Sequence, residues 1–222
     1  MFVIESLPLF PLGLVLYPHE RLPLHIFEPR YKDLVGFCVD YDEPFGVVLF
    51  EEGEMAEVGC TARVEKVAAR YEDGKMDIEV RGERRFRLIE VTQERTYLTA
   101  NVQLLSDARQ SMRSDLKERA ITQHMKLLEL AGRTVRPSLY QGVDEVSFVM
   151  AHNAGLTLQQ KQEVLELSGE NDRIQYLVSH FEDLIPRVEH LEDVRRKIQS
   201  NGHFRDFPPE TNGADNATDD GN

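Results

Sequence analysis

The hydrophobic pattern of this chain changes character near Ser106, and this change limits the folds that the sequence can adopt. From Ile4 to about Leu105, short apolar runs alternate with Gly, Pro and Asp, which is typical of a sheet-rich region. Beyond it, apolar residues recur at spacings of three and four, which is typical of amphipathic helices. The sequence therefore predicts an α+β protein with a β-rich domain (1–106), a helical subdomain (107–207) and a disordered acidic tail (208–222).

The predicted strands of the first region are short and closely spaced. They are IESLPLF, LVLY, RLPLHIF, PFGVVLFE, VGCTARVEKVAARYE, KMDIEVRG, RRFRLIEVT and YLTANVQLL. Asp73 and Gly74 lie between two alternating runs, and both residue types tolerate the positive φ that a tight hairpin turn requires. Many short strands at close spacing favour a barrel or a sandwich over a parallel sheet.

The stretch HIFEPRYKDLV predicts the start of a helix inside the β-rich region. Glu28 is suited to cap this helix, and Pro29 to occupy its first position, where a missing N–H is tolerated. The charged pair of Glu28 and Arg30 can also form a salt bridge through the Glu28 carboxylate to a neighbour such as Arg84 or Arg85, and this structural role is favoured over ligand binding. The face of the helix that is expected to be buried consists of Tyr31, Leu34, Val35 and Cys38.

The second region contains predicted helices over residues 115–131, 144–155, 156–167 and 171–200. Gly155 is expected to end the second of them, Thr157 to begin the third, and Pro186 to kink the last. The segment 133–142 is a predicted loop. A homo-oligomer through the C-terminal helix is one hypothesis, because the distal end of its apolar stripe could pair with another chain through Leu191, Val194 and Ile198.

The charge of the chain limits its partners. A net charge of -13 over 222 residues opposes attraction to phosphate backbones and to anionic lipid, so neither nucleic acid nor membrane is expected as a partner. No apolar run approaches the ~20 residues that a membrane-spanning helix needs. No Lys or Arg precedes Arg21, so the basic start of a secretory signal is missing and a cytoplasmic location is expected.

Motifs of catalysis and cofactor binding are missing from the sequence. It contains no GxxxxGK[ST], GxSxG, HExxH or CxxC, and no two histidines stand at the i, i+4 spacing of paired metal ligands. Cys38 with His25 could form a nucleophile and base, but Cys38 falls on the apolar face of its helix, which favours an inert buried thiol. We therefore predict no catalytic, cofactor-binding or metal-binding residue.

Basic residues cluster in the segment RGERRFR. On a strand, Arg85 and Arg87 share one face while Phe86 and Leu88 share the other, so a solvated outer face is expected for the two arginines. The alternative is a basic groove for RNA, for which the candidate residues are Arg63, Lys66, Arg70, Arg81, Arg85 and Arg87. Acidic residues alternate with these positions, which disfavours the groove.

The string LPLFPLGLVLYPHERLPLHIFEPRYKDLV closely resembles the start of the Lon N-terminal, substrate-binding domain. FGVVLF, VGCTARVEKV, the Asp-Gly hairpin and GERRFRLIEV…YLTANV follow in the order of that family, and the helical part is similar as well. The resemblance implies a PUA-like β pseudo-barrel followed by an α-helical bundle with a long C-terminal helix. The residues that carry this structural motif are Glu28, Pro29, Arg30, Tyr31, Gly82, Arg85 and Phe86.

The resemblance implies a polypeptide-binding role in protein quality control. Full Lon proteases carry an ATPase module and a Ser-Lys peptidase after this region, and this sequence ends in a polar tail, so we expect a non-enzymatic, adaptor-like protein. Its expected partners are unfolded or partly folded polypeptides and a protease or chaperone. An RNA-binding or small-ligand-binding module is the alternative. The candidate polypeptide contacts, for which a plain core role is the competing interpretation, are Leu12, Leu14, Leu16, Tyr17, Pro18 and His19.

Overall fold

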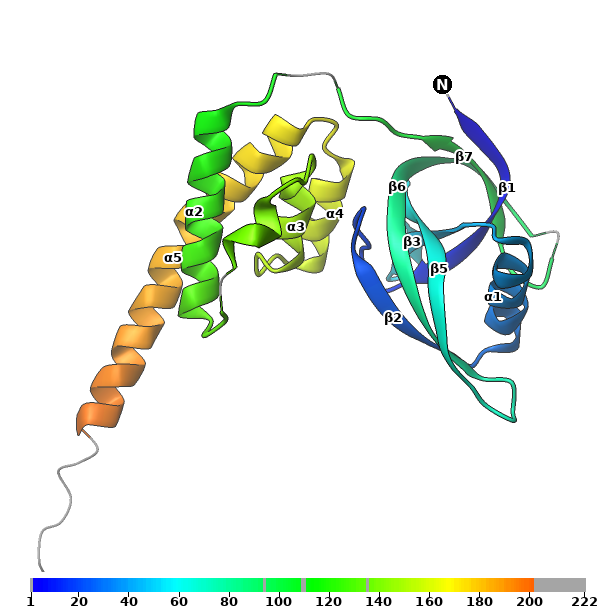
Figure 1. Cartoon of the computed structure of the whole chain (residues 1–222), viewed down its shortest axis with the longest axis horizontal. Coiled ribbons are helices and arrows are strands. Elements are labelled where there is room, and N and C mark those ends of the chain that lie inside the picture. The colour runs from blue at the N-terminus through cyan, green and yellow to red at the C-terminus, as the bar shows by residue number, and fades with distance from the viewer. Residues whose placement is uncertain (1, 94, 109–110, 135, 202–222) are drawn as a thin grey trace, which may run out of the picture. The chain divides into compact units, whose positions relative to one another are not determined.

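The structure, a computed structural model, describes residues 2–93, 95–108, 111–134 and 136–201, with side chains as far as Val194 (Figure 1). The predicted acidic tail lies outside these residues. The chain divides into two compact units, Met1–Ile185 and Pro186–Asn222. The first unit holds all the described strands together with most of the helices, so the domain boundary predicted after residue 106 stays a prediction.

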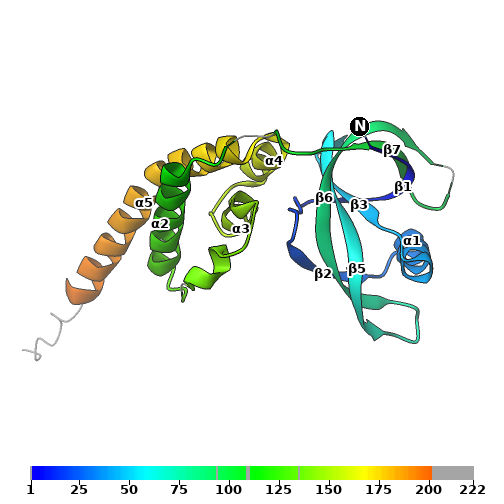
Figure 2. The same cartoon turned by 45° about the horizontal axis from the view of Figure 1, so that its top comes forward.

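The strands form one sheet whose path returns to its starting strand. They are β1 (Val3–Leu12), β2 (Arg21–Ile26), β3 (Phe45–Glu51), β4 (Glu54–Met55), β5 (Val58–Arg70), β6 (Met76–Thr92) and β7 (Thr99–Leu104). The sheet runs in the order β1-β7-β6-β5-β3-β4, and β2 pairs with β6. Because β1 also pairs in parallel with β3, through Leu9 and Gly46 among others, the sheet closes into a barrel (Figures 1 and 2). Closure leaves few unpaired strand edges.

Two predicted strands, KMDIEVRG and RRFRLIEVT, are one continuous strand. β6 pairs with β5 from Met76 to Arg87, with β2 from Met76 to Arg81 and with β7 from Phe86 to Thr92. The predicted hairpin between β5 and β6 is confirmed: Gly74 has a φ of 77°, and its backbone N–H donates to the carbonyl of Tyr71. β6 is therefore the strand that connects the rest of the sheet.

The predicted strand LVLY is wrong. Val15, Leu16 and Tyr17 are buried in succession, and the segment from Leu14 to Tyr17 makes no strand pairing. The following turn is held against β6 instead, because the N–H of His19 donates to the carbonyl of Gly82. The two backbones approach so closely that a Cβ on Gly82 would lie 2.1 Å from the carbonyl oxygen of Tyr17.

Helix α1 (Pro29–Tyr41) follows β2 and confirms the predicted helix, with Pro29 in its first turn. Its buried residues are Tyr31, Leu34, Val35 and Cys38, which is the predicted face. The predicted cap is wrong in one respect: Glu28 occupies the N-cap position, but its side chain makes no capping hydrogen bond. Its carboxylate accepts from Nε of Arg30 at 2.9 Å, and the predicted pairing with Arg84 or Arg85 is absent.

The helices of the second region are α2 (Ser114–Leu130), η1 (Pro137–Tyr140), α3 (Val146–His152), α4 (Leu158–Glu166) and α5 (Glu170–Asn201). The short helix η1 lies in the segment that was expected to be a loop. Thr157 begins α4 through a capping box with Gln160. Pro186 lies inside α5, and its predicted kink stays a prediction.

The C-terminal end of α5 carries exposed apolar side chains. Leu191 is 66% exposed and Val194 is 39% exposed. The side chain of Ile198 lies outside the described residues. The homo-oligomer predicted through this stripe therefore stays a prediction.

The interior of the barrel contains two apolar clusters. The larger includes Phe10, Leu16, Ile26, Phe45 and Val80, together with the buried face of α1. The smaller surrounds Phe86 and includes Leu7, Leu9, Ala100 and Val102. Phe86 is fully buried, as expected for a residue on the opposite face of the strand from Arg87.

We predict that Gly82→Ala destabilises the protein by about 2 kcal/mol, because overpacking against a fixed backbone carbonyl forces the turn at residues 17–20 away from β6. Gly36→Ala is the matched control. Gly36 lies in α1 with open space around its Cβ direction, so this change should stabilise by about 0.5 kcal/mol. Urea denaturation measures both, and a neutral Gly82→Ala variant would contradict the close approach.

Candidate functional site

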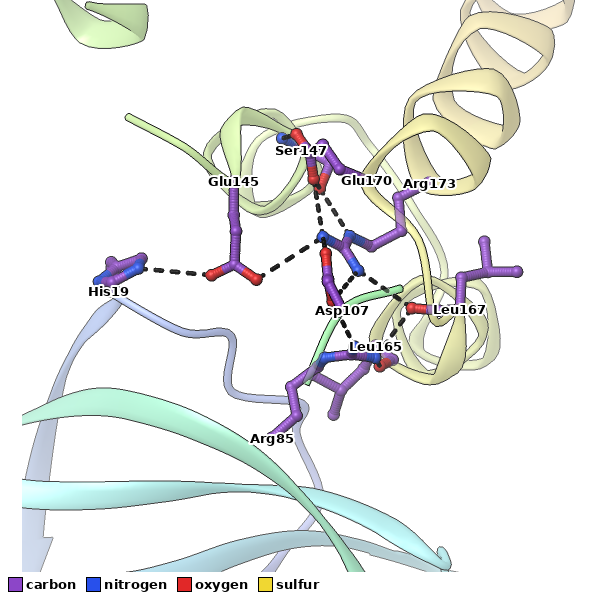
Figure 3. A network of polar contacts seen from close by, with 9 residues as sticks. All are labelled: His19, Arg85, Asp107, Glu145, Ser147, Leu165, Leu167, Glu170 and Arg173. Carbon is purple, nitrogen blue, oxygen red and sulfur yellow. Dashed lines mark hydrogen bonds and ion pairs between the residues drawn. The ribbon is translucent and has the colours of Figure 1, made fainter. Parts of the chain in front are cut away.

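A buried polar network joins β6 to the helices (Figure 3). The side chain of Arg85 projects from β6, and only 3% of this residue's surface is exposed. It donates to the carbonyls of Leu165 and Leu167 at 2.8 Å each and to Asp107 Oδ1 at 2.5 Å. The predicted solvated face is therefore wrong for Arg85, whereas Arg87 on the same strand is half exposed and pairs with Glu57. Arg85 points outward from the barrel, but the helical part covers that position.

Arg173 is the second buried arginine of the network and is fully enclosed. Its Nε donates to Ser147 Oγ at 2.8 Å, and its Nη2 donates to Glu170 Oε2 at 2.7 Å and to Asp107 Oδ2. Asp107 thus accepts from both buried arginines. Burial lowers the pKa of Arg85, and the neighbouring charge of Arg173 lowers it further.

The network is satisfied internally, which bears on catalysis. The hydroxyl of Ser147 accepts from Arg173 and donates to Glu170 Oε2 at 2.5 Å. That hydroxyl proton therefore already has a carboxylate acceptor that is held by an arginine. Burial raises the pKa of Glu145, which reaches Arg173 at 3.7 Å and His19 at 3.5 Å. The arrangement is that of a structural junction.

An apolar pocket of about 430 Å³ lies at the surface of the barrel, where β1, β2, α1 and the β3–β4 hairpin meet. Phe27 is 57% exposed and Phe50 is 44% exposed. The polar residues of its wall are His25, Glu28 and Arg30. The apolar residues are Phe10, Pro11, Leu12, Leu24, Ile26, Phe27, Tyr31, Phe50, Met55 and Leu98. This volume and this lining suit a large apolar side chain or a small apolar ligand.

The predicted polypeptide contacts do not gather in one place. Leu12 lines the apolar pocket. Leu14 is half-buried against the larger core cluster, and Leu16 belongs to that cluster, which is the competing core interpretation. Tyr17 stacks on Phe148 and donates its hydroxyl to the carbonyl of Lys161.

Pro18 and His19 line a different cavity, of about 340 Å³, next to Phe148 and His152. Pro18 is buried, whereas His19 is exposed. The role of the six residues in binding stays a prediction.

The motif at residues 28–31 lines the apolar pocket in addition to starting α1. Glu28 and Arg30 form an exposed ion pair, and the guanidinium of Arg30 lies 4.5 Å from the centre of the Tyr31 ring. Exposed pairs of this kind contribute little stability. The side chain of Glu28 therefore lies at the rim of the pocket. The start of α1 is held instead by the backbone carbonyl of Glu28, which accepts hydrogen bonds from the N–H groups of Tyr31 and Lys32.

Sequence reasoning missed most of the pocket wall, including Phe27, Phe50 and Met55. Each of these three residues lies close to the end of a strand and near acidic residues, Phe27 in the stretch HIFE and the other two in the stretch FEEGEM. An aromatic residue at a strand end beside charged residues is the available signal. It is weak, because the two phenylalanines are far apart in sequence and meet only through the closed sheet.

The basic residues proposed for an RNA groove are largely neutralised. Arg63 pairs with Asp42 and Glu83, Arg81 with Glu65, and Arg87 with Glu57. Arg85 is buried in the network. Each of these arginines therefore already has a carboxylate partner, which weighs against a surface for phosphates.

Other chemical groups have ordinary structural positions. Cys38 is buried, as predicted, and burial raises the pKa of its thiol to about 12, while burial also raises the pKa of Cys60. Among the described residues, no His, Cys, Asp and Glu side chains gather in a group that could hold a metal ion. Within the same residues, no helix combines the length and the apolar character needed to cross a membrane.

We predict that Arg85→Met destabilises the protein by about 3 kcal/mol, because it removes the cation from a buried pair and removes the arginine donor of the Leu165 carbonyl. Arg87→Met is the control, and its exposed pair should cost less than about 1 kcal/mol. Chemical denaturation measures both variants. Equal losses would contradict the buried network.

His124 gives a prediction of pH dependence. It is fully buried, its Nε2 has no hydrogen-bond partner, and burial lowers its pKa to about 4. Below pH 6.5, the ordinary pKa of histidine, the unfolded chain binds a proton at His124 that the folded protein does not bind, so stability decreases as the pH is lowered from about 6.5 to about 4. We expect a loss of about 2 kcal/mol between pH 7 and pH 5 that His124→Gln removes. Urea denaturation at both pH values tests this, and equal pH dependence in both proteins would contradict it.

Comparison with known sequences places this geometry in a family. A family model described as the ATP-dependent protease La (LON) substrate-binding domain matches residues 6–183. The Lon protease of Flavobacterium johnsoniae is 25% identical over 215 residues, which cover 87% of this chain and 26% of that protein. The Lon protease of Escherichia coli K12 is 23% identical over 211 residues, which cover 87% of this chain and 27% of that protein. The chain thus spans about a quarter of the length of these relatives.

Two solved structures are similar to the fold. The crystal structure of a Lon N-terminal domain protein from Xanthomonas campestris aligns with a TM-score of 0.63 and 28% identity, over 79% of this chain and 98% of that one. The N-terminal domain of the Mycobacterium avium complex Lon protease aligns with a TM-score of 0.57 and 18% identity, over 81% of this chain and 99% of that one. These likenesses confirm the predicted α+β fold. Since the family model matches most of the chain, this protein belongs to the Lon substrate-binding domain family.

Proposed function

We propose that this chain is a non-enzymatic polypeptide-binding protein that recognises exposed apolar side chains of unfolded or partly folded proteins. The apolar pocket is the observation that carries the proposal. Phe27 and Phe50 present large aromatic surfaces at its mouth, and Leu24 and Leu98 form part of its wall. Full burial of one such side chain contributes about 1.5–3 kcal/mol, so an apolar residue of a client would be bound weakly.

The proposal agrees with the family, whose description names a substrate-binding domain of an ATP-dependent protease. By analogy, this chain would act as an adaptor, holdase or competitor beside a protease or chaperone in the cytoplasm. A pocket lined by apolar groups selects by hydrophobicity and shape, with little dependence on sequence. Such selection suits a protein that distinguishes unfolded from folded chains.

The local chemistry supports a role without catalysis. Ser147 is held between Arg173 and Glu170, and the thiol of Cys38 is buried with a raised pKa. Neither group lines the apolar pocket. A nucleophile needs an adjacent base and access to substrate. The pocket wall includes His25 and Glu28 but no Ser, Thr or Cys side chain.

We predict that Phe27→Ser combined with Phe50→Ser weakens binding of a labelled, permanently unfolded polypeptide about tenfold, because the pocket loses its two exposed aromatic surfaces. Fluorescence anisotropy at low and near-physiological salt measures the dissociation constant. The interaction should tolerate salt, since apolar contacts carry it. A labelled single-stranded RNA serves as the competing ligand, and salt-sensitive binding of RNA alone would support the alternative function.

Ile89→Ser is the matched control for this experiment. Ile89 is 58% exposed on β6 and does not line the pocket. The Ile89→Ser substitution should change the affinity for the polypeptide by less than about twofold. An equal loss in Ile89→Ser, or an unchanged affinity in the double variant, would place binding elsewhere and overturn the proposal.

A further inference from the structure

An acidic cavity of about 410 Å³ is lined by the β3–β4 hairpin and by α4. Its polar wall consists of Glu51, Glu52, Glu54, Gln159, Gln162 and Glu166. No Lys, Arg or His belongs to its wall, and within the described part of the chain none of the four carboxylates forms an ion pair. The cavity is therefore a concentration of negative charge without a counter-charge.

The hairpin places two of these carboxylates directly opposite each other. In the antiparallel pairing of β3 with β4, Glu51 is the cross-strand partner of Glu54. Like charges at such a position destabilise a sheet by roughly 0.2–1 kcal/mol. A bound cation would remove this repulsion, so the free protein carries an electrostatic cost that a basic ligand relieves.

A buried acceptor in the same wall points independently to a donor ligand. Gln162 is 5% exposed, and its Nε2 donates to the carbonyl of Val58 at 3.0 Å and to Glu166 Oε1 at 2.8 Å. Both contacts are acceptors, so the amide orientation is fixed. Its Oε1 is left without a hydrogen-bond partner. A buried acceptor without a partner is unfavourable by about 1–3 kcal/mol, and an N–H donor in the cavity would satisfy it after a small rotation of the Gln162 side chain that opens Oε1 to the cavity.

The acidic cavity and the apolar pocket share a wall. Met55 lines both of them, and its cross-strand partner Phe50 lines the apolar pocket. A polypeptide that places an apolar side chain against Phe50 therefore has the acidic cavity within reach of a neighbouring residue. Arg is the best-suited residue because its guanidinium carries five N–H donors for carboxylates and an amide oxygen.

We propose that the acidic cavity binds an Arg or Lys side chain of the polypeptide whose apolar residue occupies the neighbouring pocket. This inference rests on the proposed polypeptide-binding function and adds a preference for clients with an apolar residue next to a basic one. A metal ion is not the occupant that the wall suits, because the described residues contain no metal-binding group of His, Cys, Asp and Glu. A phosphate or nucleic acid would be repelled.

The test uses three labelled peptides of equal length that carry the same Phe and Leu residues and differ at one flanking position, which is Arg, Gln or Glu. Fluorescence anisotropy with the full chain should give about five- to tenfold tighter binding of the Arg peptide than of the Gln peptide at low salt, and weaker binding of the Glu peptide. The preference should decrease as salt is added. Equal affinities for the Arg and Gln peptides would overturn the inference.

The variant Glu51→Gln combined with Glu54→Gln should reduce the preference for Arg to less than about twofold and leave the Gln peptide unaffected. Its melting temperature should stay equal or rise, because the opposed charges are gone, whereas a purely structural role for the two glutamates predicts a fall. Glu72→Gln with Glu90→Gln is the control of equal charge change at exposed positions outside the cavity. Loss of the preference in this control would overturn the inference.

The outcomes separate this inference from the function on which it rests. Binding of all three peptides with equal affinity, abolished by Phe27→Ser with Phe50→Ser, would support polypeptide binding and refute the basic-residue site. Binding of none of the peptides would refute both. Binding of labelled RNA through the cavity would refute the inference.

Discussion

Asp107 lies between the guanidinium groups of Arg85 and Arg173, and the arrangement of the helices against the barrel depends on this interaction. Arg85 comes from β6, Asp107 from the segment that follows β7, and Arg173 from the first turns of α5. A buried charge without a partner is highly unfavourable, so these three residues either assemble together or not at all. The last carbonyls of α4, which lack partners inside the helix, receive their donors from the same two arginines.

Such a junction restricts geometry more than an apolar contact would. Apolar surfaces can slide and repack at small cost, whereas guanidinium and carboxylate groups need specific directions. The wall of the acidic cavity includes residues of α4, next to the carbonyls that Arg85 holds. The position of Gln162 relative to the β3–β4 hairpin therefore depends on the junction. A stability defect at Arg85 and a binding defect at the acidic cavity are expected to be coupled for this reason.

Local signals predicted the elements whose causes are local. The buried face of α1, its proline start and the capping residue of α4 follow from spacing and from residue type within a few positions. The burial of Arg85 does not follow from local signals. Alternation along a strand shows which face a side chain takes, but it cannot show what covers that face. The partners of Arg85 lie far along the chain at Asp107 and Leu165.

The candidate site was less predictable than the fold for the same reason. The family motif drew attention to Glu28 and Arg30, which line the rim of the apolar pocket, and to the leucines of the first region, of which Leu12 lines it and Leu16 is core. Phe27 and Phe50 come together only when the sheet closes. Their exposure is a property of the assembled surface, because both would be assigned to the core from hydrophobicity alone.

The parallel pairing of β1 with β3 has a consequence for the order of folding. Val3 pairs with Gln103 on β7, and Leu9 pairs with Gly46 on β3, so β1 leaves the ribosome well before the strand that fixes its second edge. Pairings across such long sequence separations form slowly. Until β7 has been synthesised, Leu7, Leu9 and Phe86 lack their cover, and strand edges that the finished barrel conceals are open to other chains. A protein proposed to bind unfolded polypeptides thus passes, during its own synthesis, through a state that resembles its clients.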